Sequence, residues 1–303
     1  MEQESVLITG GSGLIGRYLT LLLLDRGYNV SHLSRKAGHT SSVPSFAWDP
    51  DKSVIDPFAF NNVDHIIHLA GANIGEGRWT PGRKAEILDS RVKSASLIFR
   101  TINTGKYRIK SFISASAAGY YGSVTSEKIF VETDPPADDF LGNICRQWEE
   151  SACRFEEAGI RTVRIRTGVV LEKSDGALSR FLSAARLGIF PILGSGNQFM
   201  PWIHIADLCE IYLRAISDNT MTGPYNAVSP SQITNREFMR VLAKVKGKQF
   251  IHPPVPSIFL RIAMGESSVV ALKGSRISCE KIIRQGFTFR FTDPEAALRD
   301  VSA

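Results

Sequence analysis

A glycine-rich run near the start of the chain constrains the fold more than any other feature. It consists of Thr9, Gly10, Gly11, Ser12, Gly13, Leu14, Ile15 and Gly16. The run follows the apolar stretch 6–8, and residues 14–26 then carry leucines at helical spacing until Gly27. A strand, a glycine turn and a helix in this order are typical of dinucleotide-binding units, in which backbone N–H groups and the helix N-terminus receive a pyrophosphate. The run therefore predicts a dinucleotide cofactor bound by residues 9–16.

The residues after the expected second strand, 29–33, indicate which cofactor that would be. NAD-binding units place an Asp or Glu about 20 residues after the glycines, where it accepts hydrogen bonds from ribose hydroxyls. This chain has Ser34, Arg35 and Lys36 there, and no carboxylate. The Arg35 guanidinium can bind a 2′-phosphate through two hydrogen bonds, and Ser34 can add a hydroxyl. We therefore expect NADP(H), although a solvated basic turn would show the same residues.

Length and composition bound the fold without deciding the function. The 303 residues can form one large domain or two closely joined ones, and the 43% apolar content is ordinary for a globular protein. No apolar run reaches membrane-spanning length, and the first expected strand starts too early to leave room for a signal peptide. The four cysteines form no CxxC pair, so neither zinc nor a disulfide framework is indicated. We expect a cytoplasmic monomer or homodimer with no metal site.

The net charge of +6 raises the question of nucleic acid as a partner. The basic residues are dispersed, and the nearest approach to a patch, at Lys106, Arg108 and Lys110, has the alternation of a solvated strand edge. An anionic cofactor or substrate explains the excess more simply. We expect a small-molecule substrate, and neither nucleic acid nor a membrane as a partner.

Apolar, β-rich runs alternate with helical segments through the first half of the chain. The further expected strands are 46–48, 63–69, 111–115 and 162–165, and the further expected helices are 83–102 and 143–158. This alternation predicts an α/β fold with a doubly wound parallel sheet of Rossmann type. Prolines break the pattern later, so we expect a dinucleotide-binding domain over 1–166 and a smaller α/β substrate lobe over 167–303. That lobe can interleave with the sheet, and its C-terminal part begins at about residue 250.

Several short motifs follow the expected strands. They are His68-Leu69-Ala70-Gly71, Ser114-Ala115-Ser116 leading to Tyr121-Gly122, Arg166-Thr167-Gly168, and Trp202-Ile203-His204-Ile205-Ala206-Asp207. Together with the glycine run, they resemble the extended short-chain dehydrogenase/reductase superfamily of NAD(P)-dependent epimerase/dehydratase type. Segments 116–122 and 264–268 are similar to an atypical, epimerase-like branch of unknown substrate that ends in a short C-terminal domain of unknown function.

The resemblance implies a catalytic Ser after the fifth strand and a Tyr-x-x-x-Lys pair on the next helix. In such enzymes the Tyr transfers a proton, while the Lys binds the nicotinamide ribose and lowers the Tyr pKa. Ser116 matches the serine, but Leu141 and Cys145 stand where the Tyr and Lys belong. Tyr120 or Tyr121 could replace the acid, or both could only pack and bond to the backbone. Cys145 could act covalently, although no basic residue is visibly paired with it.

The resemblance also assigns the remaining site residues. Further cofactor contacts fall on Leu69, Ala70, Gly71, Arg166, Thr167 and Gly168. The substrate side falls on Asn73, Trp79, Arg91, Trp202 and His204. If Arg91 points inward, it could hold a carboxylate or phosphate of the substrate, and otherwise it is a surface residue of an amphipathic helix. Trp79 could stack on the substrate or pack in the core, and Asp207 could pair with His204 or brace a helix.

Two functions of different classes remain open at this point. One is an NADP(H)-dependent oxidoreductase or epimerase-like enzyme that acts on a small polar substrate. The other is a catalytically silent NADP(H)-binding regulator that contacts protein partners, since some members of the similar branch carry cell-division-inhibitor labels. Ser116, Tyr120 and Tyr121 discriminate between them, because only an enzyme needs these residues to move a proton.

Overall fold

The computed structural model describes residues 3–35, 43–250 and 254–302, and its centre is an eight-stranded sheet. The strands lie in the order β12 (Gly223–Ala227), β8 (Arg161–Thr167), β6 (Ser111–Ala117), β5 (His65–His68), β1 (Ser5–Thr9), β2 (Asn29–Ser34), β3 (Ser45–Asp49) and β4 (Val54–Ile55). Neighbouring strands are parallel except β3 and β4, which are antiparallel. The predicted α/β fold with a doubly wound parallel sheet is confirmed.

The strand order reverses between β1 and β5. Thr9, the last residue of β1, lies opposite Leu33 of β2 on one side and His68 of β5 on the other. The carboxyl ends of these three strands therefore meet at one edge of the sheet. Doubly wound sheets bind their ligands outside this edge, at the point where the strand order reverses.

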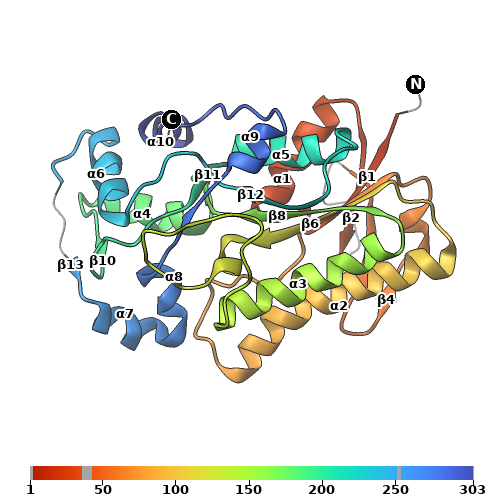
Figure 1. Ribbon diagram of the computed structural model, residues 1–303, viewed down its shortest axis with the longest axis horizontal. Coiled ribbons are helices and arrows are strands. Elements are labelled where there is room, and N and C mark those ends of the chain that lie inside the picture. Colours follow the sequence, from red (N-terminus) through yellow and green to blue (C-terminus); the bar gives the residue numbers. More distant parts are fainter. Residues whose placement is uncertain (1–2, 36–42, 251–253, 303) are drawn as a thin grey trace.

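Helices cover both faces of the sheet (Figure 1). On one face α1 (Leu14–Asp25) packs beside α5 (Ile205–Ser217), and on the other α2 (Pro81–Gly105) packs beside α3 (Phe140–Glu157). Val6 and Ile8 belong to the core on the first side, and Leu7 belongs to the core on the second. Because both faces are covered, the three central residues of β1 are all apolar, as is usual in parallel strands.

The predicted helix over 83–102 is longer at both ends. Its N-terminus is set by Thr80, whose side chain accepts a hydrogen bond from the backbone N–H of Arg83 at 3.2 Å, followed by Pro81 at the first helical position. The expected stop at 103–105 is itself helical, because the chain turns only at Lys106, with a φ of 53°.

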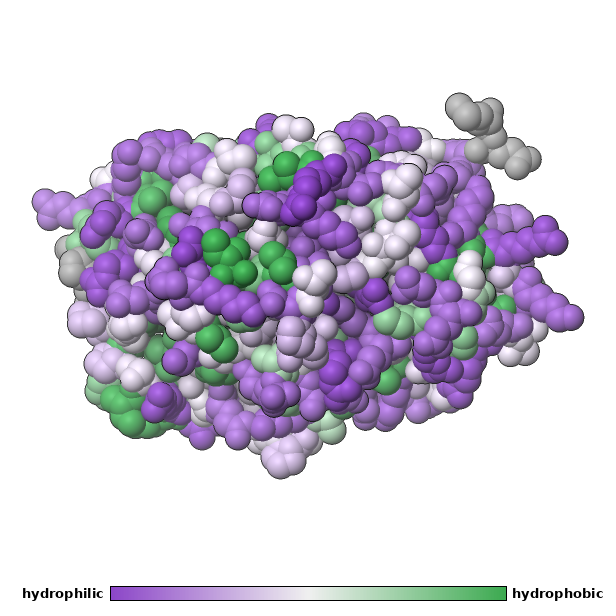
Figure 2. Space-filling model, in the orientation of Figure 1, coloured by the Kyte–Doolittle hydropathy of each residue, from purple (hydrophilic) through white to green (hydrophobic). Residues whose placement is uncertain are grey.

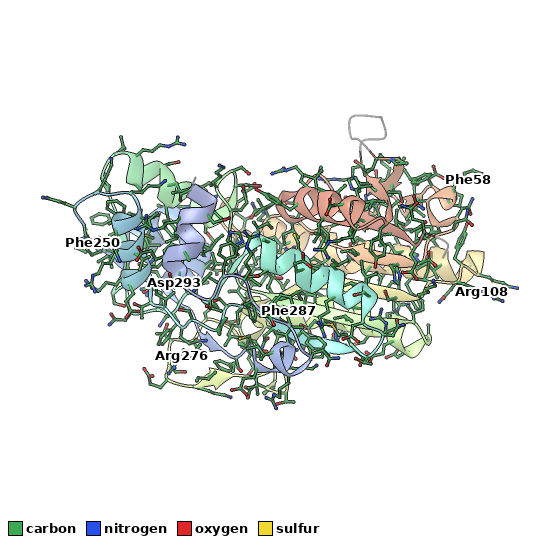
Figure 3. All side chains as sticks on the ribbon, turned by 90° about the horizontal axis from the view of Figure 1, so that it is seen from above. Phe58, Arg108, Phe250, Arg276, Phe287 and Asp293 are labelled. Carbon is green, nitrogen blue, oxygen red and sulfur yellow. The ribbon has the colours of Figure 1, made fainter. Side chains whose placement is uncertain are left out.

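The second half of the chain adds a strand to the sheet and builds a core of its own. Strand β12 belongs to the part of the chain after the predicted boundary at 166/167, but it pairs with β8, which lies mostly before that boundary. The other elements are β9 (Val169–Leu171), α4 (Gly176–Arg186), β10 (Ile192–Leu193), β11 (Trp202–His204), α6 (Asn235–Val245), β13 (Pro254–Val255), α7 (Ser257–Met264), α8 (Val269–Leu272), β14 (Arg276–Ile277), α9 (Glu280–Arg284) and α10 (Pro294–Ser302), with β7 (Ile129–Phe130) pairing with β14. Figure 3 shows Phe58 and Arg108 at one end of the molecule and Phe250 at the other.

Asp207 joins the C-terminal segment to α5. Its two carboxylate oxygens accept hydrogen bonds from the backbone N–H groups of Arg290 and Phe291, at 2.8 and 3.0 Å. Asp207 therefore braces a distant segment of chain and not its own helix.

The surface is mostly polar, with apolar patches such as the one over α7 (Figure 2). Its exposed apolar side chains are Ile258, Phe259 and Ile262. None of the described helices combines the length and the apolar character that crossing a membrane would require.

Candidate functional site

The glycine run forms a tight turn between β1 and α1. Gly10 has a φ of +73°, and a Cβ on it would lie 3.1 Å from the backbone nitrogen of Ala70. A Cβ on Gly16 would lie 2.4 Å from the carbonyl oxygen of Gly10, and one on Gly11 would lie 2.5 Å from the His32 ring. The turn therefore closes only with glycine at these three positions, which is the requirement of a dinucleotide loop.

The N-terminus of α1 differs from those of the next five α-helices. Helices α2 to α6 have side-chain caps, from Thr80, Asp139, Asp175, His204 and Thr234. Helix α1 follows Gly13 and, among the described residues, has neither a side-chain cap nor an acidic residue in its first turn. Its first N–H groups and the positive end of its dipole therefore suit an anionic ligand.

The end of β2 lies beside this turn. Because Leu33 is opposite Thr9, Ser34 and Arg35 leave the sheet next to the glycine run. Arg35 is exposed, and Lys36 lies outside the described residues. The end of β2 thus brings a hydroxyl, and the residue after it a cation, to the side of the glycine turn.

Thr9 and His68 fix the carboxyl ends of β1 and β5 to each other. The Thr9 hydroxyl accepts a hydrogen bond from the backbone N–H of Ala70 at 3.1 Å and lies 2.8 Å from Nδ1 of His68. Nε2 of His68 lies 3.1 Å from the Ser94 hydroxyl, and burial lowers the pKa of His68 to about 4. The imidazole is therefore neutral at physiological pH, and Thr9 positions Leu69 and Ala70 beneath Gly10.

Ser116 belongs to a buried network around one ion pair. The Ser116 hydroxyl donates to Oε1 of Glu149 at 2.7 Å. Arg166 donates to the same carboxylate from Nε at 2.8 Å and from Nη2 at 2.9 Å. Burial alone would lower the pKa of Arg166, but the hydrogen bonds and charge of Glu149 outweigh it and raise that pKa. The side chain of Arg166, predicted to touch the cofactor, is thus used inside the protein.

The two tyrosines predicted as acids have different surroundings. The Tyr121 hydroxyl is buried, donates to Oδ1 of Asn226 at 2.7 Å and accepts from Nη1 of Arg166 at 2.9 Å. Burial raises its pKa, so it stays protonated and donates a hydrogen bond to Asn226. Tyr120 is half-buried, and its ring centroid lies 3.4 Å from the Arg166 guanidinium carbon. Burial also raises the pKa of Tyr120, and the adjacent positive charge of Arg166 opposes this rise, so the phenol is protonated at neutral pH.

Cys145 and Leu141 occupy the positions of the missing Tyr-x-x-x-Lys pair on α3. A Cβ on Gly119 would lie 3.5 Å from Leu141 Cβ and 3.7 Å from Cys145 Sγ, so both face the loop after β6. Burial raises the pKa of the Cys145 thiol to about 12, and the nearby positive charge of Arg91 only partly offsets this. The sequence shows no basic residue paired with Cys145, and the structure adds the nearby charge of Arg91, but the thiol is still protonated and inert as a nucleophile.

Arg91 points inward and is only 8% exposed, so the surface alternative is excluded. Its guanidinium carbon lies 4.7 Å from the centroid of the Trp148 ring, and Nη1 donates to the carbonyl oxygen of Ile87 at 2.7 Å. A Cβ on Gly71 would lie 3.0 Å from that guanidinium carbon. Arg91 thus reaches the carboxyl end of β5, beside the predicted cofactor contacts.

Asn73 and Trp79 shape the loop after β5. Asn73 Oδ1 accepts from the backbone N–H of Gly75 at 2.9 Å, which closes a short turn. Trp79 is buried against Phe140, with ring centroids 4.8 Å apart, and its Nε1 donates to the carbonyl of Ile74 at 3.0 Å. In this structure the indole therefore packs in the core.

Trp202 and His204, which the resemblance assigns to substrate binding, are both buried in this structure. Trp202 is fully buried in the core of the second half. Nδ1 of His204 accepts the backbone N–H of Ala206 at 3.1 Å, and its ring stacks on Phe291 with centroids 3.8 Å apart. Burial lowers the pKa of His204 to about 4.

Gly168 owes its identity to close backbone packing. A Cβ there would lie 2.3 Å from the carbonyl oxygen of Pro201. The neighbouring residue, Thr167, is the last residue of β8 and lies opposite Ala117, the last residue of β6. Thr167 and Gly168 therefore end beside the loop that carries Tyr120.

Sequence reasoning missed Glu149 and Arg17. Glu149 lies among the buried residues Cys145, Trp148 and Ala152 of α3, so a carboxylate on the apolar face of a helix was the available signal. Arg17 donates from Nη1 to the carbonyl oxygen of Ser12 at 3.0 Å and braces the glycine turn from outside.

Comparison with known proteins agrees with this geometry. A sequence profile of the NAD dependent epimerase/dehydratase family matches residues 6–228, and a domain of unknown function (DUF1731) matches residues 255–301. The chain belongs to the NAD dependent epimerase/dehydratase family.

Members of this family cover the chain almost completely. Epimerase family protein YfhF of Bacillus subtilis is 34% identical over 302 residues, which is 99% of this chain and 98% of the relative. Human epimerase family protein SDR39U1 is 34% identical over 307 residues, which is 98% of this chain and 99% of the relative.

Solved structures of the family have the same fold. The crystal structure of human SDR39U1 (isoform 2) with NADPH has a TM-score of 0.87 at 31% identity, and covers 98% of this chain and 99% of that one. The UDP-glucose 4-epimerase of Thermus thermophilus, solved with NAD, has a TM-score of 0.80 at 21% identity, covering 98% of each chain, which shows the fold alone.

Proposed function

We propose that this protein binds NADP(H) and acts as an oxidoreductase or epimerase-like enzyme on a small polar substrate. The main support is the N-terminus of α1, which has no side-chain cap and follows a turn that only glycines can form. Ser34 and Arg35 stand where NAD-binding units have a carboxylate, which supports the 2′-phosphorylated ribose of NADP(H) over the free 2′-hydroxyl of NAD(H). The NADPH bound to human SDR39U1 supports the same choice.

NADP(H) supplies a hydride when bound, and the protein's residues supply binding, orientation and a proton. The N–H groups at 13–16 would bind the pyrophosphate, and Arg35 the 2′-phosphate. Tyr120 would donate the proton, because it lies on the loop directly after β6 and its ring is next to the Arg166 guanidinium, whose positive charge would stabilise the developing phenolate. Ser116 would act through Glu149, and hence through the position of Arg166 under the Tyr120 ring.

The cofactor assignment is tested by comparing affinities for NADPH and NADH. Arg35→Ala should weaken NADPH binding by about tenfold or more, through the loss of a charge-assisted contact, and leave NADH binding nearly unchanged. Arg108→Ala is the matched control, since Arg108 is an exposed arginine before the amino end of β6, at the opposite edge of the sheet from the carboxyl end of β2 that Arg35 follows. It lies at one end of the molecule (Figure 3). Equal weakening of both cofactors by Arg35→Ala would refute the assignment.

Turnover is tested with purified protein, NADPH and a panel of small carbonyl compounds. We expect NADPH oxidation with at least one of them, and its loss in Tyr120→Phe with cofactor affinity retained. Unchanged turnover in Tyr120→Phe would remove this residue from the proposed mechanism.

The second candidate is an NADP(H)-binding regulator without turnover. Two observations favour it: the Tyr121 hydroxyl is hydrogen-bonded to both Asn226 and Arg166, and a protonated Cys145 stands in place of a lysine. It predicts tight NADPH binding, no oxidation with any carbonyl, and a protein partner recovered by affinity capture whose binding depends on NADPH.

A further inference from the structure

Two arginines are buried in the described part of the chain, and only one of them has a counter-charge. Arg166 has Glu149, whereas the ion pairs between described residues include none for Arg91. Nε of Arg91 is buried with no hydrogen-bond partner among the described residues. Among the described residues, the charged or titratable groups that interact with Arg91 are the protonated thiol of Cys145, the neutral imidazole of His68 and a second cation, Arg83.

A lone buried cation is costly. Removing a guanidinium from water is unfavourable unless an anion and further acceptors replace the lost hydration. Burial lowers the pKa of Arg91 to about 10, which leaves it charged at physiological pH. The Trp148 ring and the Ile87 carbonyl compensate for part of the cost only.

The guanidinium lies next to the predicted cofactor site. Gly10 of the glycine turn packs against Leu69 and Ala70, and Gly71, the next residue, packs against Arg91. Gly71 is exposed, and a side chain there would meet the guanidinium at 3.0 Å. The absence of that side chain leaves Arg91 a path to the carboxyl edge of the sheet.

We propose that Arg91 is the anchor for an anionic group of the substrate, a carboxylate or a phosphate, bound beside Gly71. Trp148 and Ile87 hold the guanidinium plane, so that its remaining N–H groups can form two parallel hydrogen bonds to one anion. The inference rests on the proposed function, because it names the charge of the substrate of that same site.

The test measures thermal denaturation of the full-length protein, saturated with NADPH, against rising malonate or inorganic phosphate. Sodium chloride at equal ionic strength is the reference, and the two probes distinguish carboxylate from phosphate. We expect a saturable rise in Tm for the wild type with at least one probe. Arg91→Met should abolish the rise or raise the half-saturating concentration at least about tenfold.

Two variants control for charge and for folding. Arg100→Met removes an exposed arginine from the same helix, and it should respond to the probes like the wild type. Arg91→Lys keeps the cation without the two-pronged geometry, and it should respond at a severalfold higher probe concentration. This variant tests the proposal even where Arg91→Met does not fold.

The same titrations without cofactor, and NADPH binding to each variant, separate the two proposals. NADPH affinity within about twofold of the wild type in Arg91→Met, with the anion response lost, supports an anchor for the substrate and not for the cofactor. A wild type that binds no NADPH but keeps an Arg91-dependent anion response would refute the proposed function alone. No saturable response in the wild type, or an equal response in Arg91→Met, would overturn the anchor.

Discussion

The buried arginines Arg166 and Arg91 lie at the same edge of one sheet and differ in every partner. Arg166 gives its N–H groups to Glu149, Tyr121 and the carbonyl of Glu132. Arg91 has one carbonyl of its own helix and an aromatic ring. A fully paired buried charge serves the fold, because every lone pair and proton around it is satisfied. An unpaired one costs stability and is retained for a ligand.

The Arg166 network also joins parts of the chain that are far apart in sequence. Tyr121 binds Asn226 of β12, whose backbone N–H donates to the Glu132 carboxylate at 2.9 Å. Nδ2 of Asn226 donates to the carbonyl of Ser278 in the C-terminal segment, also at 2.9 Å. Tyr121, a candidate replacement for the missing catalytic tyrosine, therefore connects the sheet to the C-terminal region.

The largest effect that would sharpen the comparison is expected from Arg166→Met. The substitution leaves the Glu149 carboxylate buried without its counter-charge, and should lower the free energy of unfolding by about 3–5 kcal/mol. Urea denaturation measures this. Adding Glu149→Leu should recover part of the loss, and a single variant that loses less than about 1 kcal/mol would contradict the structural role of the pair.

The buried His68, whose hydrogen-bond partners are the Thr9 and Ser94 hydroxyls, makes the stability of the fold depend on pH. Burial lowers the folded-state pKa of His68 from 6.5 to about 4, so the unfolded chain binds the proton more readily. The contribution of His68 to stability is complete above pH 6.5 and is lost as pH falls toward 4. It amounts to about 3 kcal/mol. As the pH is lowered from 6.5 toward 4, the free energy of unfolding should fall less steeply in His68→Asn than in the wild type. An identical slope in the two proteins would contradict the burial argument.

A smaller effect is expected from Tyr121→Phe. The variant leaves Asn226 Oδ1 and one N–H of Arg166 without a partner, which should cost about 1–3 kcal/mol of unfolding free energy. Tyr107→Phe is the matched control, because the exposed Tyr107 hydroxyl bonds only to the carbonyl of Pro57 among the described residues. The control should change stability by no more than about 0.5 kcal/mol. Equal losses in both variants would break the distinction between the buried network and the surface.

The smallest effect is expected from Arg91→Met. Removing an unpaired buried charge should leave the free energy of unfolding of the ligand-free protein unchanged or raise it by up to about 1 kcal/mol, since the contact with Trp148 is lost as well. A loss above about 2 kcal/mol in urea denaturation would show that Arg91 serves the fold, and the comparison with Arg166 would fail.

Local signals were enough for the first unit of the fold. The apolar stretch before Gly10, the glycines and the leucines of α1 lie within one short segment, so their spacing alone predicted the strand, turn and helix. The lack of a carboxylate after β2 is also local, and it indicated the cofactor class. The end of α2 was less accurately predicted, because its stop depends on the left-handed conformation of Lys106.

The roles of Ser116, Tyr121, Arg166 and Arg91 could not be derived in the same way. Whether Arg166 meets Glu149 depends on how far α3 is rotated on the sheet, and whether Arg91 meets Gly71 depends on how α2 packs beside it. These are contacts between different helices and strands, and the spacing of residues within one element carries no information about them. The amino-acid sequence by itself thus determined the strand–glycine–helix unit and the missing lysine. Only the tertiary structure decided which buried cation is paired and which is left for a ligand, because pairing depends on distances between elements.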